Sequence, residues 1–152
     1  MKTALLEYRL FKGRDSFEAL FHYETTLDQI LARRECEFFV KDGITYKQTS
    51  SAIEGDMHLI YVEKHDEGEK EKEEFNLNST LKLEMRQFNS RKDHPMIKML
   101  ELERHIDILS YIGSFYHYID GLEWERDSAE IDEDRRVYVL YMKQTGYKME
   151  GL

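Results

Sequence analysis

The chain of 152 residues contains a single cysteine and a single proline. A lone Cys36 cannot form an intrachain disulfide, which is typical of proteins from a reducing compartment. We interpret Cys36 as a small buried hydrophobic residue, because no basic cluster surrounds it that would create a reactive thiol. One proline, Pro95, cannot build a proline-rich linker. The sequence therefore predicts one domain over residues 1–145 and a flexible tail over residues 146–152.

Long apolar runs are also missing. No stretch approaches the ~18 uncharged apolar residues that a membrane-spanning helix needs, and the N-terminus lacks the pattern of a secretory signal. The formal net charge is −9, from 31 acidic and 22 basic residues. Nucleic acids and anionic membrane surfaces are bound by clustered lysine and arginine, so neither is expected as a partner. We expect a cytoplasmic protein.

The motifs of common enzymes are absent from the sequence. It contains no glycine-rich nucleotide-binding loop, no Gly-x-Ser-x-Gly elbow and no His-Glu-x-x-His pair, and one cysteine cannot make a Cys-x-x-Cys zinc site. Glu101 and His105 have the spacing of one helix face, with Asp107 nearby, but a metal there would need further ligands from elsewhere. We predict no catalytic residue, no metal and no cofactor.

Negative charge is concentrated in two segments of this sequence. Residues 63–74 (EKHDEGEKEKEE) hold seven acids and three bases, and residues 120–136 (DGLEWERDSAEIDEDRR) hold eight acids and three bases. Together they carry the whole net charge, so the rest of the chain is neutral. Two acidic segments on a neutral body favour the capture of a basic protein partner, because they speed its approach and repel acidic competitors.

Apolar periodicity predicts a first helix over residues 16–34. Its apolar residues recur at intervals of three and four, as on one face of an amphipathic helix. Asp15 and Glu18 resemble a capping box at its start, and two arginines lie at its end, where the helix dipole favours cations.

A second helix is expected after Asp93, which would cap it, with Pro95 in its first turn. Apolar spacing carries this helix to Gly121. The alternative is a helix that ends at Gly113, followed by an extended segment over residues 115–119.

The clearest strand signal is a hairpin, in which Asp42 and Gly43 join residues 36–41 to residues 44–49. Residues 50–56 are polar and are interpreted as a loop. Further strands are predicted over residues 3–11, 57–63, 77–88, 122–126 and 137–142, and the continuous apolar run of the second makes it central. We identify no internal repeat. The predicted fold class is α+β, a mostly antiparallel sheet of about five to seven strands with two main helices on one face.

Aromatic residues are densest over residues 111–118, next to the second acidic segment. Tyrosines at this density either form the rim of the core or take part in an interface. For a partner-binding surface, Tyr118 and Trp124 would be the aromatic anchors, and Glu123, Glu125 and Asp127 the charged rim.

Two other functions remain open on the sequence. One is a small-molecule-binding domain with a cavity between the sheet and the second helix, whose polar groups would come from His105, Tyr116, His117 and Tyr118. The other is self-association, for example as a homodimer, because an exposed edge strand invites pairing. The interaction or regulatory protein with a basic partner is our first hypothesis.

Overall fold

The structure, a computed structural model, describes residues 2–67 and 80–148. Its N-terminal half contains β1 (Thr3–Phe11), β2 (Phe17–Thr26), α1 (Leu27–Arg34), β3 (Phe38–Lys41), β4 (Ile44–Glu54) and β5 (Met57–Glu67). Its C-terminal half contains β6 (Leu81–Gln87), a 3-10 turn (Ser90–Lys92), β7 (Met96–Leu102), α2 (His105–Ile112), β8 (Tyr116–Ile119), β9 (Leu122–Asp132) and β10 (Val137–Lys148).

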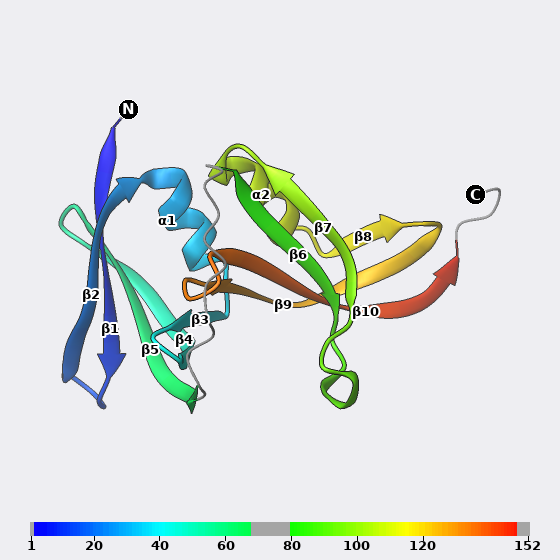
Figure 1. The fold of residues 1–152 in the computed structure, drawn as a ribbon. Helices are drawn as coiled ribbons and strands as arrows, with labels where there is room; N and C mark the ends of the chain where they lie inside the picture. The colour runs from blue at the N-terminus through cyan, green and yellow to red at the C-terminus, as the bar shows by residue number, and fades with distance from the viewer. Residues whose placement is uncertain (1, 68–79, 149–152) are drawn as a thin grey trace.

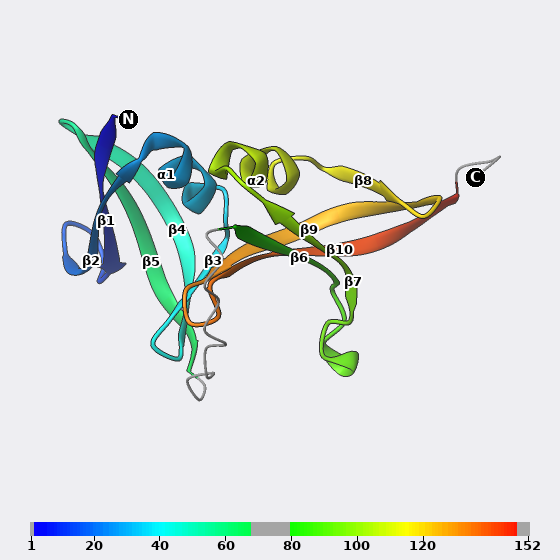
Figure 2. The same cartoon turned by 45° about the horizontal axis from the view of Figure 1, so that its top comes forward.

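All ten strands belong to one strongly twisted sheet (Figure 1). Their order across it is β2-β1-β5-β4-β3-β9-β10-β6-β7, and β8 pairs with the free side of β9. Both helices lie side by side on the same face of this sheet (Figure 2).

The predicted fold class is therefore wrong. The molecule is mostly β, not a balanced α+β domain, and its sheet has ten strands in place of five to seven. The sheet is mixed, because β1 pairs with β5, β3 with β9, and β6 with β10 in parallel. Each α-helix is eight residues long.

The first predicted helix is wrong over its first half. Residues 17–26 form β2, which pairs with β1 along its whole length. The sequence FEALFHYETT is rich in aromatic residues and threonine, which suit a half-buried strand, and the helix begins only at Leu27. Asp15 caps no helix; its φ of 65° places it in the turn between β1 and β2.

The second predicted helix is also wrong at its start. Pro95 precedes β7, which pairs with β6 although its sequence MIKMLEL has a good local preference for helix. Asp93 has a φ of 57° and belongs to the turn before that strand. The alternative end is confirmed: α2 ends at Ile112 with Gly113 as its C-cap, and Tyr116–Ile119 form the strand β8.

Several strand predictions are confirmed. The hairpin turns at Asp42 and Gly43, with φ values of 54° and 77°, and β5 is central, between β1 and β4. The loop expected over residues 50–56 is wrong, because β4 continues to Glu54 and the chain turns at Gly55.

The remaining strands differ from the predictions in length. The strand predicted over residues 77–88 is described from Leu81 onward as β6, and residues 77–79 lie outside the described residues. The short strand at 122–126 is the long β9. In the segment predicted as a tail, residues 146–148 belong to β10, and residues 149–152 are outside the described part.

The two halves of the chain repeat one fold. Each has the order strand, strand, helix, three strands, paired as β2-β1-β5-β4-β3 in the first half and β7-β6-β10-β9-β8 in the second. Equivalent residues from the helix to the fourth strand lie 78 positions apart, as the pairs Phe39↔Tyr46 and His117↔Trp124 illustrate. Register shifts recur at equivalent points, after Tyr8 in the first strand of one half and after Met85 in that of the other.

The expectation of no internal repeat is therefore wrong. Its sequence trace is short: residues 3–11 (TALLEYRLF) and 80–88 (TLKLEMRQF) are identical at five of nine positions, and both halves turn at an Asp-Gly pair. Over residues 44–49 and 122–127 the two halves share the same pattern of burial without one identical residue, so identity alone does not reveal the repeat.

The core lies between the sheet and the helices. Ile30 of α1 and Ile108 of α2 are fully buried in it, and they occupy equivalent positions of the two halves. Leu83 and Leu140 from the strands pack into the same cluster.

We predict that Ile108→Ala lowers the free energy of unfolding by about 3 kcal/mol, because it leaves a cavity in this core. Ile106→Ala is the matched control: it lies on the same helix but is 44% exposed, whereas Ile108 is 0% exposed. Urea unfolding measures both. An equal, small effect of the two substitutions would contradict the placement of α2.

Candidate functional site

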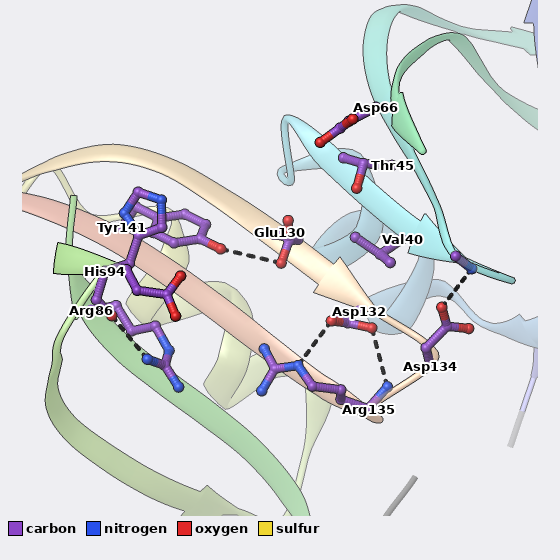
Figure 3. A pocket seen from close by; sticks show the side chains of 12 residues that line it. Val40, Thr45, Asp66, Arg86, His94, Glu130, Asp132, Asp134, Arg135 and Tyr141 are labelled. Atoms are coloured by element: carbon purple, nitrogen blue, oxygen red, sulfur yellow. Dashed lines mark hydrogen bonds and ion pairs between the residues drawn. The ribbon is translucent and has the colours of Figure 1, made fainter. Parts of the chain in front are cut away.

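A cavity of about 440 Å³ opens where the two halves of the chain meet. The β3–β4 hairpin and the end of β5 line it from the first half, and β6, β9 and β10 line it from the second (Figure 3). On β9, Ala129 and Ile131 belong to the core. Because side chains alternate along a strand, Glu130 and Asp132 point to the opposite face, into the cavity.

Both acidic segments of the sequence contribute to this cavity. Asp66, from residues 63–74, lines one side, and Glu130, Asp132 and Asp134 from the second segment line the other (Figure 3). Residues 68–74 of the first segment lie outside the described residues.

Asp134 locks the two halves together. Its carboxylate accepts hydrogen bonds from the backbone N–H groups of Asp42 and Gly43, both at 2.8 Å. The two turn residues of a hairpin point these N–H groups outward, where a carboxylate from another part of the chain can accept from both. The carboxylate therefore fixes the β3–β4 hairpin against the turn between β9 and β10.

A network of arginines neutralises the next carboxylates. Arg135 donates to Asp132 at 3.0 Å and to Glu84 at 3.0 Å, and Arg86 donates to Glu84 at 2.9 Å. Although burial acts in the opposite direction, these two arginines lower the pKa of Glu84. In this part of the cavity wall, two arginines balance the charge of two carboxylates.

Glu130 differs from these carboxylates, because its pKa is raised. Burial, and then the neighbouring Asp132 carboxylate, raise its pKa from the ordinary value of 4.5 to about 7. The Tyr141 hydroxyl donates a hydrogen bond to it at 3.3 Å (Figure 3). Within residues 2–67 and 80–148, no Lys or Arg forms an ion pair with Glu130. The cavity thus holds a carboxyl group that a cation would stabilise in its ionised form.

The residues predicted to bind a partner lie elsewhere. Trp124 is 5% exposed and packs in the core, so its indole does not reach the surface as an anchor. Tyr118 is exposed on β8 and donates to Glu123 at 2.9 Å. Glu125 is exposed, and Asp127 pairs with Lys143 at 3.3 Å. None of these five lines the cavity.

Much of the second acidic segment is neutralised inside the molecule. Glu133 forms ion pairs with Arg33 at 2.7 Å and with Lys41 at 3.1 Å, and Asp132 pairs with Arg135 at 3.0 Å. The reason is topological. β9 lies inside the sheet, between β10 and the strands β3 and β8, so basic side chains of neighbouring strands lie within reach of its acids.

The four residues predicted for the alternative ligand site do not line one cavity in the structure. A second cavity, of about 420 Å³, contains His105 at the start of α2, whose ring is 6.0 Å from that of Tyr138. Burial lowers the pKa of His105. His117 is buried and stacks on Tyr111, whereas Tyr116 and Tyr118 are exposed on β8. These β8 residues do not line the cavity, and the small-molecule function stays a prediction.

Sequence reasoning missed Asp66, Glu130, Asp132 and Asp134 as individual site residues. It singled out the segments that contain them, but a count of charge does not say which carboxylates converge. The repeat would have helped: Glu130 corresponds to Ala52 in the first half, so it is an acid that the shared fold does not require.

Comparison of the chain with protein-family models, with curated proteins and with solved structures finds no match. Among the described residues, none of the helices has the length and apolar character to cross a membrane. In the same part of the chain, no group of three or more His, Cys, Asp or Glu side chains is arranged to hold a metal ion.

We predict that Glu130→Gln stabilises the protein at pH 8 by roughly 1–3 kcal/mol. Between pH 4.5 and about 7 the unfolded chain ionises Glu130 while the folded protein keeps it protonated, so its contribution to stability falls as pH rises through this window. The advantage of the variant should therefore shrink as pH falls toward 4.5. Urea unfolding at several pH values measures it.

The matched control for this prediction is Glu125→Gln, an exposed glutamate on the same strand. It should change stability little at either pH. A Glu130 variant that is less stable than the natural protein at pH 8 would show that the carboxylate is not an electrostatic cost to the fold.

Proposed function

We propose that this chain is a binding protein that captures a basic segment of a protein partner, with a Lys or Arg side chain entering the acidic cavity. The observation that carries the proposal is the convergence of both acidic segments on one cavity. Among the described residues, its charged lining holds more acids than bases, with five carboxyl side chains and two arginines, namely Asp66, Asp93, Glu130, Asp132 and Asp134 against Arg86 and Arg135.

The chemistry of the cavity favours a cation over other ligands. A volume of about 440 Å³ accommodates a long basic side chain, and the carboxyl group of Glu130 lies ready to accept a charge-assisted hydrogen bond. A bound cation favours the ionised form of Glu130, so binding near pH 6–7 is coupled to the release of a proton. We place this function in the cytoplasm, which the lone buried thiol of Cys36 supports.

Electrostatics also predicts how the affinity depends on salt. The cavity is open to solvent and the chain carries a net charge of −9, so a basic partner is attracted before contact. Screening by salt weakens this attraction within a Debye length of roughly 10 Å at 0.1 M.

The test is an NMR titration of the protein with a tetra-arginine peptide as the basic probe. We expect saturable shifts of the Gly43, Thr45 and Glu130 amides, which weaken as NaCl rises from about 50 to about 500 mM. Asp66→Asn and Glu130→Gln should each weaken binding several-fold, on the order of 1 kcal/mol.

Glu63→Gln is the matched control, because it removes the same charge from an exposed position of β5 that does not line the cavity. Its affinity should stay close to that of the natural protein. If Glu63→Gln and Glu130→Gln weakened binding equally, the attraction would be a property of net charge, and the cavity would not be the binding site.

A further inference from the structure

The junction between the two halves is made by strand pairing. On one side, β3 pairs with β4 of its own half; on the other, it pairs in parallel with the end of β9, through Phe38↔Glu130, Phe39↔Ile131 and Val40↔Asp132. The N–H of Glu133 donates to the carbonyl of Val40 at 2.9 Å and extends this ladder.

Each of the two strand edges that form this junction has an equivalent edge in the other half, and that equivalent edge is unpaired among the described residues. The repeat makes β8 the equivalent of β3, and among the described residues β8 pairs with β9 alone. The equivalent of the end of β9 is residues 51–54 of β4, which within the described chain pair with β5 on one side. The junction is therefore heterologous, because it joins two different edges, β3 of the first half and the end of β9 of the second half. Among the described residues, the equivalent edges, β8 and residues 51–54 of β4, are left unpaired, in addition to the outermost strands β2 and β7.

The locking groups of the junction are present at the free edges. Asp134 corresponds to Asp56, which is exposed. The turn of Asp42 and Gly43 corresponds to Asp120 and Gly121, whose φ values of 51° and 77° match the 54° and 77° of the first turn. A carboxylate and a turn of the same geometry are thus both present, at opposite ends of the molecule.

Apolar side chains also mark the free edges. Ile131 is 6% exposed at the junction, whereas Ile53, the equivalent residue on β4, is 61% exposed. On β8, Tyr116 and Tyr118 are exposed as well. An exposed isoleucine at the position that the other half buries is explained if Ile53 is also covered, by a strand from outside the chain.

We propose that a second copy of this chain supplies that strand. In the assembly, β8 of one copy pairs in parallel with residues 51–54 of the next, in the register Tyr116↔Ala52, His117↔Ile53 and Tyr118↔Glu54. The Asp56 carboxylate accepts hydrogen bonds from the N–H groups of the Asp120-Gly121 turn of that other copy. Repetition of this contact gives a closed ring if the rotation between copies closes, and a filament if it does not.

The ion pairs of the internal junction do not obstruct this contact. Glu133 and Arg33, which pair at 2.7 Å, correspond to Gly55 and Tyr111, so the new contact buries no unpaired charge at that point. Because each copy carries a net charge of −9, copies repel one another at long range. Self-association should therefore strengthen with salt, in contrast to the capture of a basic partner, and the two proposals can fail separately.

Sedimentation velocity on the full chain tests the proposal, over about 5 to about 500 µM and in about 0.15 M salt. We expect concentration-dependent association. Ile53→Lys and Asp56→Ala, at the proposed edge, should each raise the dissociation constant by roughly tenfold or more.

Two matched controls lie on the outermost strands of the sheet. Met99→Lys on β7 places the same charge on another exposed apolar residue, and Glu18→Ala on β2 removes another exposed carboxylate. Both should associate as the natural chain does. A chain that stays monomeric throughout this range overturns the proposal, and association that survives both edge substitutions overturns the assigned surface.

Disulfide trapping checks the register directly. Glu54→Cys and Tyr118→Cys are introduced into separate chains, which are mixed and oxidised; the natural Cys36 is buried and does not compete. We expect the mixed dimer to form in preference to either homodimer. Equal trapping when Met99→Cys replaces Glu54→Cys would contradict the register.

Discussion

The parallel pairing of β3 with the end of β9 is the contact on which the rest of the molecule depends. Each half of the chain is a five-stranded unit, and this short ladder makes the two units one continuous sheet. A ladder of three residue pairs is short for a contact that joins the two halves of the chain. The junction is reinforced by the packing of α1 against α2, by the ion pair of Arg126 with Glu37, and by the Asp134 carboxylate on the hairpin turn.

The same junction creates the candidate site. Where the β3–β4 hairpin meets β9, the strand faces on the side away from the helices enclose a space that neither half encloses alone. Acids of both segments lie in this space, since one half contributes Asp66 and the other contributes Glu130. Most of the acids of residues 120–136 have structural partners, so the outward-facing charge is smaller than the sequence suggests. Among these acids, Glu130 has a strongly raised pKa.

The features that were predicted correctly from the sequence are those that depend on residues close together in the chain. The Asp42-Gly43 hairpin follows from a turn that needs positive φ, and the central β5 follows from its continuous apolar run. The acidic segments were also recognised, because charge is additive along a chain. The cavity was not, because it depends on which strands become neighbours across 60 or more residues, as Asp66 and Glu130 do.

The long helices were mispredicted for a related reason. Residues 17–26 and 96–102 have apolar spacing that suits a helix, but they form the second strand of each half, where pairing with β1 or β6 outweighs local preference. Their error is the same in both halves, since the repeat places the same kind of strand at the same point.

One kind of contact, a carboxylate on an Asp-Gly hairpin turn, holds the two halves together inside the chain, and we propose that it is used again between chains. Hydrogen exchange of the four turn amides tests it most directly. We expect the Asp42 and Gly43 amides to be protected at every protein concentration, and those of Asp120 and Gly121 to become protected only as the concentration rises. Rapid exchange at Asp42 and Gly43 in the folded protein, or exchange at Asp120 and Gly121 that never slows, would contradict it.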